Sequence, residues 1–151
     1  MTKTFLSALS LAALLPLSAV ADSISGTYDN TLDTLYAVSQ PGSRAPDGDS
    51  YCKETFGKFV GSTVSGTYDI NTTTLMMSAT ATFEGSEASM FPLGISGRYA
   101  FMTDGVPAPL SDMGVNRIIL NLSTDFSDKE SDVLFNGNAD YNCLLSNRAA
   151  N

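Results

Sequence analysis

The stretch TLMMSATATF, residues 74–83, decides the fold class. Every second position on one side of this stretch is apolar, and the intervening positions are mostly Thr or Ser. The apolar positions are Leu75, Met77, Ala79, Ala81 and Phe83. A period of two is that of a β-strand, whose successive side chains point to opposite faces of the sheet. The stretch therefore predicts a strand with one core face and one mostly polar face.

The same alternation recurs along the chain. Residues 117–123 place Ile118, Leu120 and Leu122 on one side, and residues 139–145 place Cys143 on the core side. Less regular segments that we expect to be strands are residues 24–28, 32–39, 56–69 and 91–102, the longer ones broken at Gly61 or Gly94. No segment after residue 21 shows a sustained helical period. We therefore expect an all-β domain, a single small antiparallel β-barrel or β-sandwich of about seven to nine strands.

Turn signals separate these strands. Asn136-Gly137 lies between the predicted strand segments 133–135 and 139–141, and this dipeptide favours a tight hairpin. Two longer segments rich in Gly and Pro, residues 40–50 and 104–114, are predicted to be irregular loops.

The first 21 residues have the features of a secretory signal peptide. Lys3 precedes an apolar run over residues 5–17, and residues 19–21 (Ala-Val-Ala) form a small-x-small cleavage site. The run is too short to span a membrane. We expect residues 22–151 to form one exported domain, periplasmic or extracellular.

The charge balance limits the partners. Lys3 is the only charged residue of the leader, so residues 22–151 carry 7 Lys and Arg against 16 Asp and Glu, a net charge of −9. Such a field repels nucleic acid and anionic lipid, and it favours solubility. We therefore expect neither a nucleic-acid partner nor membrane insertion.

The chain contains two cysteines, Cys52 and Cys143. In an oxidising compartment an even cysteine count indicates a disulfide. The bond would close a loop of 91 residues, and it would hold the segment around Tyr51 beside the last predicted strand.

A pentapeptide occurs twice. SGTYD forms residues 25–29 and again residues 65–69, and SGRY at residues 96–99 is a looser third copy. In one interpretation Tyr28, Tyr68 and Tyr99 line a ligand site. In the interpretation that we favour, Gly lets a strand bend while Tyr covers the adjacent core.

Gly-x-Tyr strands such as those at Tyr68 and Tyr99 resemble strands of small ligand-binding barrels, the avidins and lipocalins. Those families typically place Trp in or beneath their cavities, and this chain has no Trp. We therefore assign the chain to neither family.

The residue inventory narrows the chemistry. The chain has no His, which excludes Ser-His-Asp and Cys-His catalysis and His-based zinc ligation, and it has no phosphate-binding loop. Carboxylates remain, and the densest run is Asp125, Asp128, Glu130 and Asp132. Its spacing fits a solvated turn better than a catalytic pair or a calcium loop. We therefore predict no catalytic residue, no metal and no cofactor. Sequons at Asn71 and Asn121 matter only in a eukaryotic host.

The sequence thus predicts an exported, non-enzymatic β-domain that binds a small molecule, a glycan or a protein. The candidate contacts are Tyr28, Tyr68 and Tyr99, with Val106 and Leu110 from the apolar loop VPAPL; this loop could equally cover a core edge. One alternative is a structural or assembly subunit of the cell surface that pairs with copies of itself or with another surface protein through an exposed strand edge or the apolar loop. A second is a carboxylate-based hydrolase.

Overall fold

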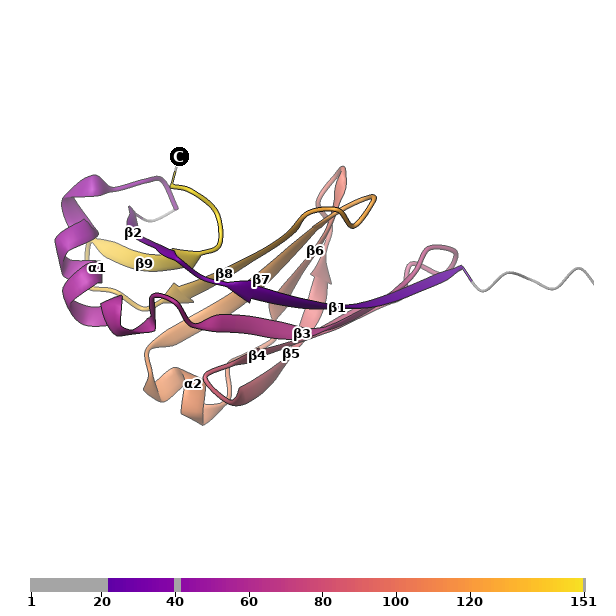
Figure 1. Cartoon of the computed structure of the whole chain (residues 1–151), viewed down its shortest axis with the longest axis horizontal. Coiled ribbons are helices and arrows are strands. Elements are labelled where there is room, and N and C mark those ends of the chain that lie inside the picture. Colours follow the sequence, from indigo (N-terminus) through magenta and orange to yellow (C-terminus); the bar gives the residue numbers. More distant parts are fainter. Residues whose placement is uncertain (1–21, 40–41, 151) are drawn as a thin grey trace, which may run out of the picture.

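The computed structural model of the chain describes residues 22–39 and 42–150 (Figure 1). The predicted signal peptide, residues 1–21, lies outside the described residues. The described part forms one curled antiparallel sheet, a half-barrel, which confirms the all-β prediction. Its nine strands are β1 (Ser23–Thr31), β2 (Thr34–Ser39), β3 (Thr63–Asn71), β4 (Met77–Phe83), β5 (Ser86–Leu93), β6 (Arg98–Thr103), β7 (Val115–Ser123), β8 (Lys129–Phe135) and β9 (Tyr141–Ser146).

The strand order, β1-β3-β4-β5-β6-β7-β8-β9-β2, is a meander with its first two strands on opposite edges. Only Leu32 and Asp33 separate β1 from β2. The Leu32 N–H donates to Ser62 O at 2.8 Å, and the Asp33 N–H donates to Ser146 O at 3.1 Å. The chain therefore changes partner strand at this point, and the two edges of the sheet are joined at one end. We call this the closed end.

The opposite end of the sheet is open. It carries the turns β3–β4 (residues 72–76), β5–β6 (residues 94–97) and β7–β8 (residues 124–128). In Figure 1 the first of these turns extends to the right with the start of β1, while the other two rise at the top, so the sheet splays apart.

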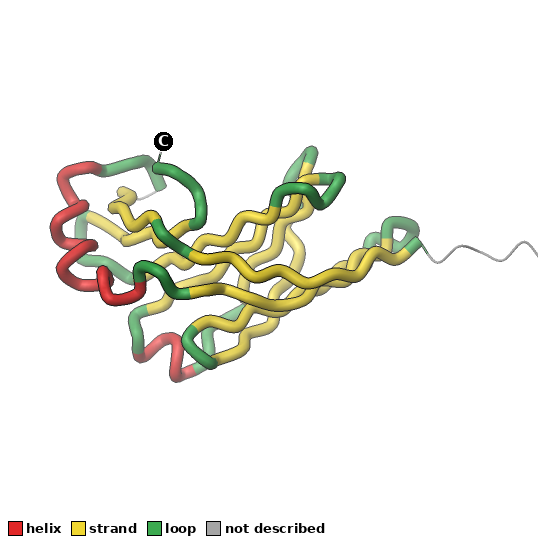
Figure 2. Tube along the Cα trace, viewed as in Figure 1, coloured by secondary structure: helices red, strands yellow, loops and turns green. Residues whose placement is uncertain are grey.

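Short helices lie at the closed end of the sheet (Figure 2, red). They are η1 (Pro46–Gly48), α1 (Asp49–Phe56), η2 (Gly57–Phe59) and α2 (Ala108–Asp112). The sequence pattern did not reveal them. In α1 only Cys52 and Phe56 are buried, a single four-residue step that cannot establish a helical period. Parts of both predicted loops, residues 40–50 and 104–114, and the beginning of the predicted strand 56–69 are therefore helical.

The helices fill the closed end with aromatic rings. Phe56 and Phe59 stack on Phe135 with ring centroids 4.5 and 5.2 Å away, and Phe59 also meets Phe83 at 5.8 Å. These rings continue the core that lines the inner face of the sheet. No helix among the described residues is long and apolar enough to cross a membrane.

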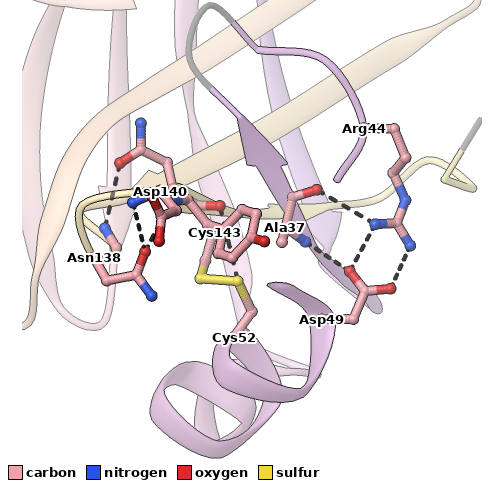
Figure 3. Close-up of a disulfide and its surroundings, with 10 residues drawn as sticks. Ala37, Arg44, Asp49, Cys52, Asn138, Asp140 and Cys143 are labelled. Atoms are coloured by element: carbon pink, nitrogen blue, oxygen red, sulfur yellow. Dashed lines mark hydrogen bonds and ion pairs between the residues drawn. A yellow bond between two sulfur atoms is a disulfide. The ribbon is translucent and has the colours of Figure 1, made fainter. Parts of the chain in front are cut away.

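The predicted disulfide is present. Cys52 of α1 is bonded to Cys143 of β9, with their Cα atoms 5.5 Å apart (Figure 3). Beside it, the Asp49 carboxylate accepts two hydrogen bonds from Arg44, at 2.6 and 2.5 Å, and one from the Ala37 N–H at 2.9 Å. The segment that leads into α1 is thus fastened to β2 and β9.

Two local predictions need correction. Strand β4 begins at Met77, so Leu75 lies in a turn at φ 58° and is 71% exposed instead of facing the core. Strands β8 and β9 form the predicted hairpin, but five residues, 136–140, connect them rather than two. Gly137 is still required there, because a Cβ would lie 1.7 Å from Tyr141 O.

Candidate functional site

The two SGTYD copies pair with each other. In the β1–β3 register Ser25 is opposite Asp69, Gly26 opposite Tyr68, Thr27 opposite Thr67, Tyr28 opposite Gly66 and Asp29 opposite Ser65. A Cβ at Gly26 would lie 2.2 Å from the Tyr68 hydroxyl, and a Cβ at Gly66 would lie 3.0 Å from the Tyr28 ring. Each tyrosine thus covers the glycine of the other copy, which accounts for the repeat.

Tyr28 belongs to the core. Only 4% of it is exposed, and its hydroxyl donates to Thr80 O at 2.7 Å. Burial raises the pKa of this phenol far above its ordinary value. A buried hydroxyl that already has its partner stabilises the sheet and offers little to a ligand.

Tyr68 and Tyr99, in contrast, belong to a stack of three rings at the open end. The Phe126 ring lies between them, 5.6 Å from the Tyr68 centroid and 5.4 Å from the Tyr99 centroid, with interplanar angles of 4° and 5°. Tyr68 comes from β3, Tyr99 from β6 and Phe126 from the β7–β8 turn. We call these three residues the aromatic clamp.

The turn holds Phe126 in an unusual backbone conformation. Its φ is 60°, a left-handed value that is rare for a bulky side chain. The Phe126 N–H donates to Ser123 O at 2.9 Å. The Asp125 carboxylate accepts hydrogen bonds from the Ser123 and Ser127 hydroxyls, both at 2.7 Å, which together lower its pKa to about 2. Asp125 therefore organises the turn that presents Phe126.

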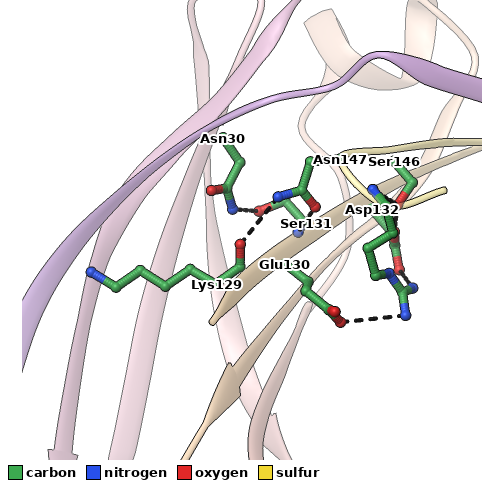
Figure 4. Close-up of polar contacts among 8 residues, drawn as sticks. Asn30, Lys129, Glu130, Ser131, Asp132, Ser146 and Asn147 are labelled. Carbon is green, nitrogen blue, oxygen red and sulfur yellow. Dashed lines mark hydrogen bonds and ion pairs between the residues drawn. The ribbon is translucent and has the colours of Figure 1, made fainter. Parts of the chain in front are cut away.

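The other acidic residues of the predicted cluster point elsewhere. Asp132 accepts hydrogen bonds from Ser146 and Arg148, both at 2.5 Å, and Glu130 lies 3.3 Å from Arg148 (Figure 4). These carboxylates fasten the C-terminal residues to β8. Among the described residues, no group of three or more Cys, Asp or Glu is arranged to hold a metal ion.

Lys129, the first residue of β8, lies beside the clamp. Its ammonium donates to Thr27 O at 3.0 Å and lies 5.7 Å from the centroid of the Tyr68 ring. Figure 4 shows its side chain extended away from Glu130 and Asp132. Lys129 forms none of the ion pairs found within the described residues, which involve Arg44 and Arg148.

Side chains bridge the gap between β1 and β8. The Asn30 amide donates to the Ser131 hydroxyl at 2.7 Å. The Asn147 amide accepts from the Ser131 N–H at 2.9 Å and donates to Lys129 O at 3.1 Å, so it occupies the place of a neighbouring strand (Figure 4). The first residues of β8, 129–131, lie beyond its pairing with β9 and are thereby capped.

Apolar side chains surround the open end. Ile24 at the start of β1, Leu75 and Met76 in the β3–β4 turn and Ile95 in the β5–β6 turn are 38, 71, 74 and 45% exposed. These side chains leave apolar surface exposed in two of the three turns at this end and at the start of β1.

The structure separates the residues that the sequence singled out. Tyr68 and Tyr99 meet through Phe126, whereas Val106 and Leu110 lie at the other end of the sheet. Leu110 is fully buried in the core and Val106 is half-buried against it. The sequence analysis missed Phe126 and Lys129. The available signal was an aromatic residue in the otherwise polar turn STDFSDK.

The outer face of the sheet offers a second, more open surface. Two shallow grooves of about 550 and 590 Å³ run across β1, β3 and β4 on either side of the row Thr27, Thr67 and Thr80. Their polar side chains are mainly Ser and Thr, with Asp29, Asp69, Glu87 and Lys129 among them. Such surfaces are typical of a solvated sheet face.

Comparison with known proteins identifies no relative: no protein family model, no curated protein and no solved structure matches this chain.

Proposed function

We propose that this protein binds a small molecule with a planar apolar ring at the open end of the half-barrel, where the ring takes the place of Phe126 between Tyr68 and Tyr99. The observation that carries the proposal is the parallel stack itself, with centroid distances of 5.6 and 5.4 Å. Two tyrosines on separate strands hold a slot one ring wide, and a residue from a turn fills it.

The three rings differ in how firmly they are held. Tyr68 and Tyr99 project from hydrogen-bonded strands, whereas Phe126 comes from a turn of five residues and has a left-handed backbone. That conformation costs roughly 1–2 kcal/mol for a residue with a Cβ. Each aromatic contact is worth about 0.5–1.5 kcal/mol beyond the area that it buries. A ligand ring that made the same two contacts would release the turn from its strain.

The surroundings favour an apolar ligand. The exposed side chains of Ile24, Leu75, Met76 and Ile95 lie at the same end of the sheet as the clamp. The predicted export of the domain is consistent with a protein that captures a molecule outside the cell. We propose binding without catalysis, because the carboxylate of Asp125, next to Phe126 in the same turn, already accepts hydrogen bonds from Ser123 and Ser127.

The test compares a ring-sized probe, 2-naphthol, on three proteins by equilibrium dialysis. Phe126→Ala empties the slot and should bind the probe about tenfold more tightly than the unaltered protein, because the competing ring is gone. Phe91→Ala is the matched control, since Phe91 is a partly exposed ring on the outer face of β5. It should bind as the unaltered protein does.

A second substitution ties binding to the clamp. Tyr99→Ala in the Phe126→Ala background should remove the gain. Phe126→Leu keeps apolar bulk in the turn and serves if the alanine variant folds poorly. The proposal is wrong if Phe126→Ala and Phe126→Leu, both folded by near-ultraviolet circular dichroism, bind 2-naphthol no better than Phe91→Ala.

An assembly role is a second candidate, and the edge of β1 favours it. The Thr72 N–H donates to Asp22 O, and the Leu32 N–H donates to Ser62 O. The backbone N–H and C=O groups of even-numbered residues in β1 are therefore directed toward β3. Odd-numbered residues then direct their N–H and C=O groups away from β3. Lys129 occupies Thr27 O, so the uncovered part of this edge is the start of β1, which includes Ser25. An uncovered edge of this kind is a template for another strand.

Sedimentation velocity across a concentration series tests the assembly role. If β1 pairs between molecules, dimers should appear as concentration rises, and Ser25→Pro should prevent them because it deletes an edge N–H. Ser25→Ala also loses the hydroxyl that bonds Asp69 but keeps the N–H, so it is the control. A protein that remains monomeric throughout has no such role.

A further inference from the structure

Lys129 occupies an electrostatically unusual position in this molecule. The chain has 16 acidic residues against 8 basic ones, yet the Lys129 ammonium is bonded to a neutral carbonyl, Thr27 O. Its neighbour in sequence, Glu130, pairs with Arg148 instead. Lys129 is half-buried, and it is in phase along β8 with Ser131, Val133 and Phe135, whose side chains are buried on the inner face. The side chain therefore begins on the inner face of the open end, and its ammonium reaches the edge of β1 at Thr27 O.

The ammonium adjoins the clamp. The Lys129 nitrogen is 5.7 Å from the Tyr68 centroid, and the Phe126 ring is 5.6 Å from the same centroid, so both lie against one tyrosine. The four flexible methylene groups of the lysine side chain allow its ammonium to move toward a substituent on a ring bound beside Tyr68. An ammonium has three donors, and Thr27 O accepts only one of them.

We infer that the ligand of the clamp is a planar aromatic carboxylate and that Lys129 is its counter-ion. This inference rests on the proposed function and specifies its ligand class. A carboxylate on the ring would accept charge-assisted hydrogen bonds from Lys129, and such bonds are roughly twice as strong as neutral ones. Elsewhere the acidic surface repels anions, so the local cation selects where an anion binds.

The experiment uses two probes of nearly equal shape, 2-naphthoate and the uncharged 2-naphthamide. Both are titrated into the unaltered protein and into Phe126→Ala. We expect 2-naphthoate to bind about tenfold more tightly than 2-naphthamide in each protein. Lys129→Met keeps the apolar stem and removes the charge, so it should abolish this preference while the affinity for 2-naphthamide stays the same. Lys129→Arg should retain it.

Lys58→Met supplies the matched control. Lys58 also lies over an aromatic ring, 5.0 Å from the Phe59 centroid, but in η2 at the closed end. Its loss should leave the preference for 2-naphthoate intact. This control separates a local counter-ion from a general change in net charge.

The outcomes distinguish the two proposals. If neither probe binds to either protein, the proposed function fails. If both probes bind with equal affinity, or if Lys129→Met weakens both alike, the clamp binds rings but the assignment of a carboxylate ligand is overturned.

Discussion

Gly66 shows how closely a single residue is constrained in this sheet. A Cβ at this position would lie 2.0 Å from Thr80 O and 3.0 Å from the Tyr28 ring. Gly66→Ala should therefore push β3 and β4 apart and cost about 1–3 kcal/mol. That cost exceeds the roughly 0.5–1 kcal/mol that alanine gains over glycine in backbone entropy. Urea unfolding measures the difference.

Gly94→Ala is the control for this prediction. A Cβ at Gly94 meets no atom within 4 Å. Its effect should stay within about 0.5 kcal/mol of zero. Equal stabilities of Gly66→Ala and Gly94→Ala would show that the close packing around Gly66, including the Tyr28 ring over it, does not contribute to the free energy of unfolding.

Asp49 makes the stability of the folded protein partly dependent on pH in the acid range. The hydrogen bonds from Arg44 lower the pKa of this carboxyl. The pKa of Asp49 is lower in the folded protein than in the unfolded chain, where it is about 3.9. The ionised carboxylate therefore stabilises the folded state at pH values above about 3.9, and this stabilisation is lost as the pH falls through the folded-state pKa. The Asp49 side chain is 39% exposed, so solvent screens this contribution and it is small. Asp49→Asn should lessen the drop in unfolding midpoint between pH 5 and pH 2.

Asp112→Asn, a change of an exposed carboxyl in α2, provides the comparison for the pH series. It should follow the unaltered protein across the whole range. If the unfolding midpoint of Asp49→Asn shows the same pH dependence, the ion pair of Asp49 with Arg44 does not contribute to the pH dependence of stability.

At the residue scale the sequence identified two of the three clamp residues. Tyr68 and Tyr99 were recognisable because they repeat with a glycine two positions before them. Phe126 was not recognisable, because an aromatic residue in a polar turn has no periodic partner. Its neighbours across the stack are 58 residues before it and 27 residues before it, and only the curl of the sheet brings them together.

Among the elements, α1 depends most on a covalent bond. A helix of eight residues is marginal on its own. It is attached to the sheet by the Cys52–Cys143 bond and by the stacking of Phe56 on Phe135. Replacing both cysteines with alanine should cost roughly 2–5 kcal/mol. Amide hydrogen exchange should accelerate in α1 before it does so in β3 and β4.

The location of the exchange is the decisive readout for the disulfide. Stabilisation through the unfolded chain alone would speed exchange across the whole domain, since the loop spans 91 residues. A local increase over α1 shows that the bond also holds the helix against β9. Unchanged exchange in α1 would contradict this role.

Strands and helices differed in how well the sequence predicted them. The inward faces of β4 and β7 agree with the alternation, because each strand has one buried and one exposed side. Helices α1 and α2 are too short to display a period. The choice between barrel and sandwich depends on the change of partner at Leu32 and Asp33. No hydrophobic pattern encodes those two backbone hydrogen bonds.

The curl of the whole molecule depends on this change of partner. Leu32 is fully buried at the point where the first strand leaves β3 for β9. Its side chain fills the closed end, and the amide of the next residue already bonds the opposite edge. A loss of packing here should loosen both edges together. In contrast, Leu35 is half-buried within β2 and bonded to one neighbour, β9.

Leu32→Ala should therefore cost about 2–5 kcal/mol, the range for a large buried side chain, and Leu35→Ala should cost less. Hydrogen exchange in Leu32→Ala should accelerate in β3 and β9 together, because one residue joins the two edges that these strands flank. For Leu35→Ala the increase should be confined to β2 and β9. An effect of Leu32→Ala on β3 alone would mean that the two edges are independent. The half-barrel would then owe its curl to strand twist and to the bridges between β1 and β8.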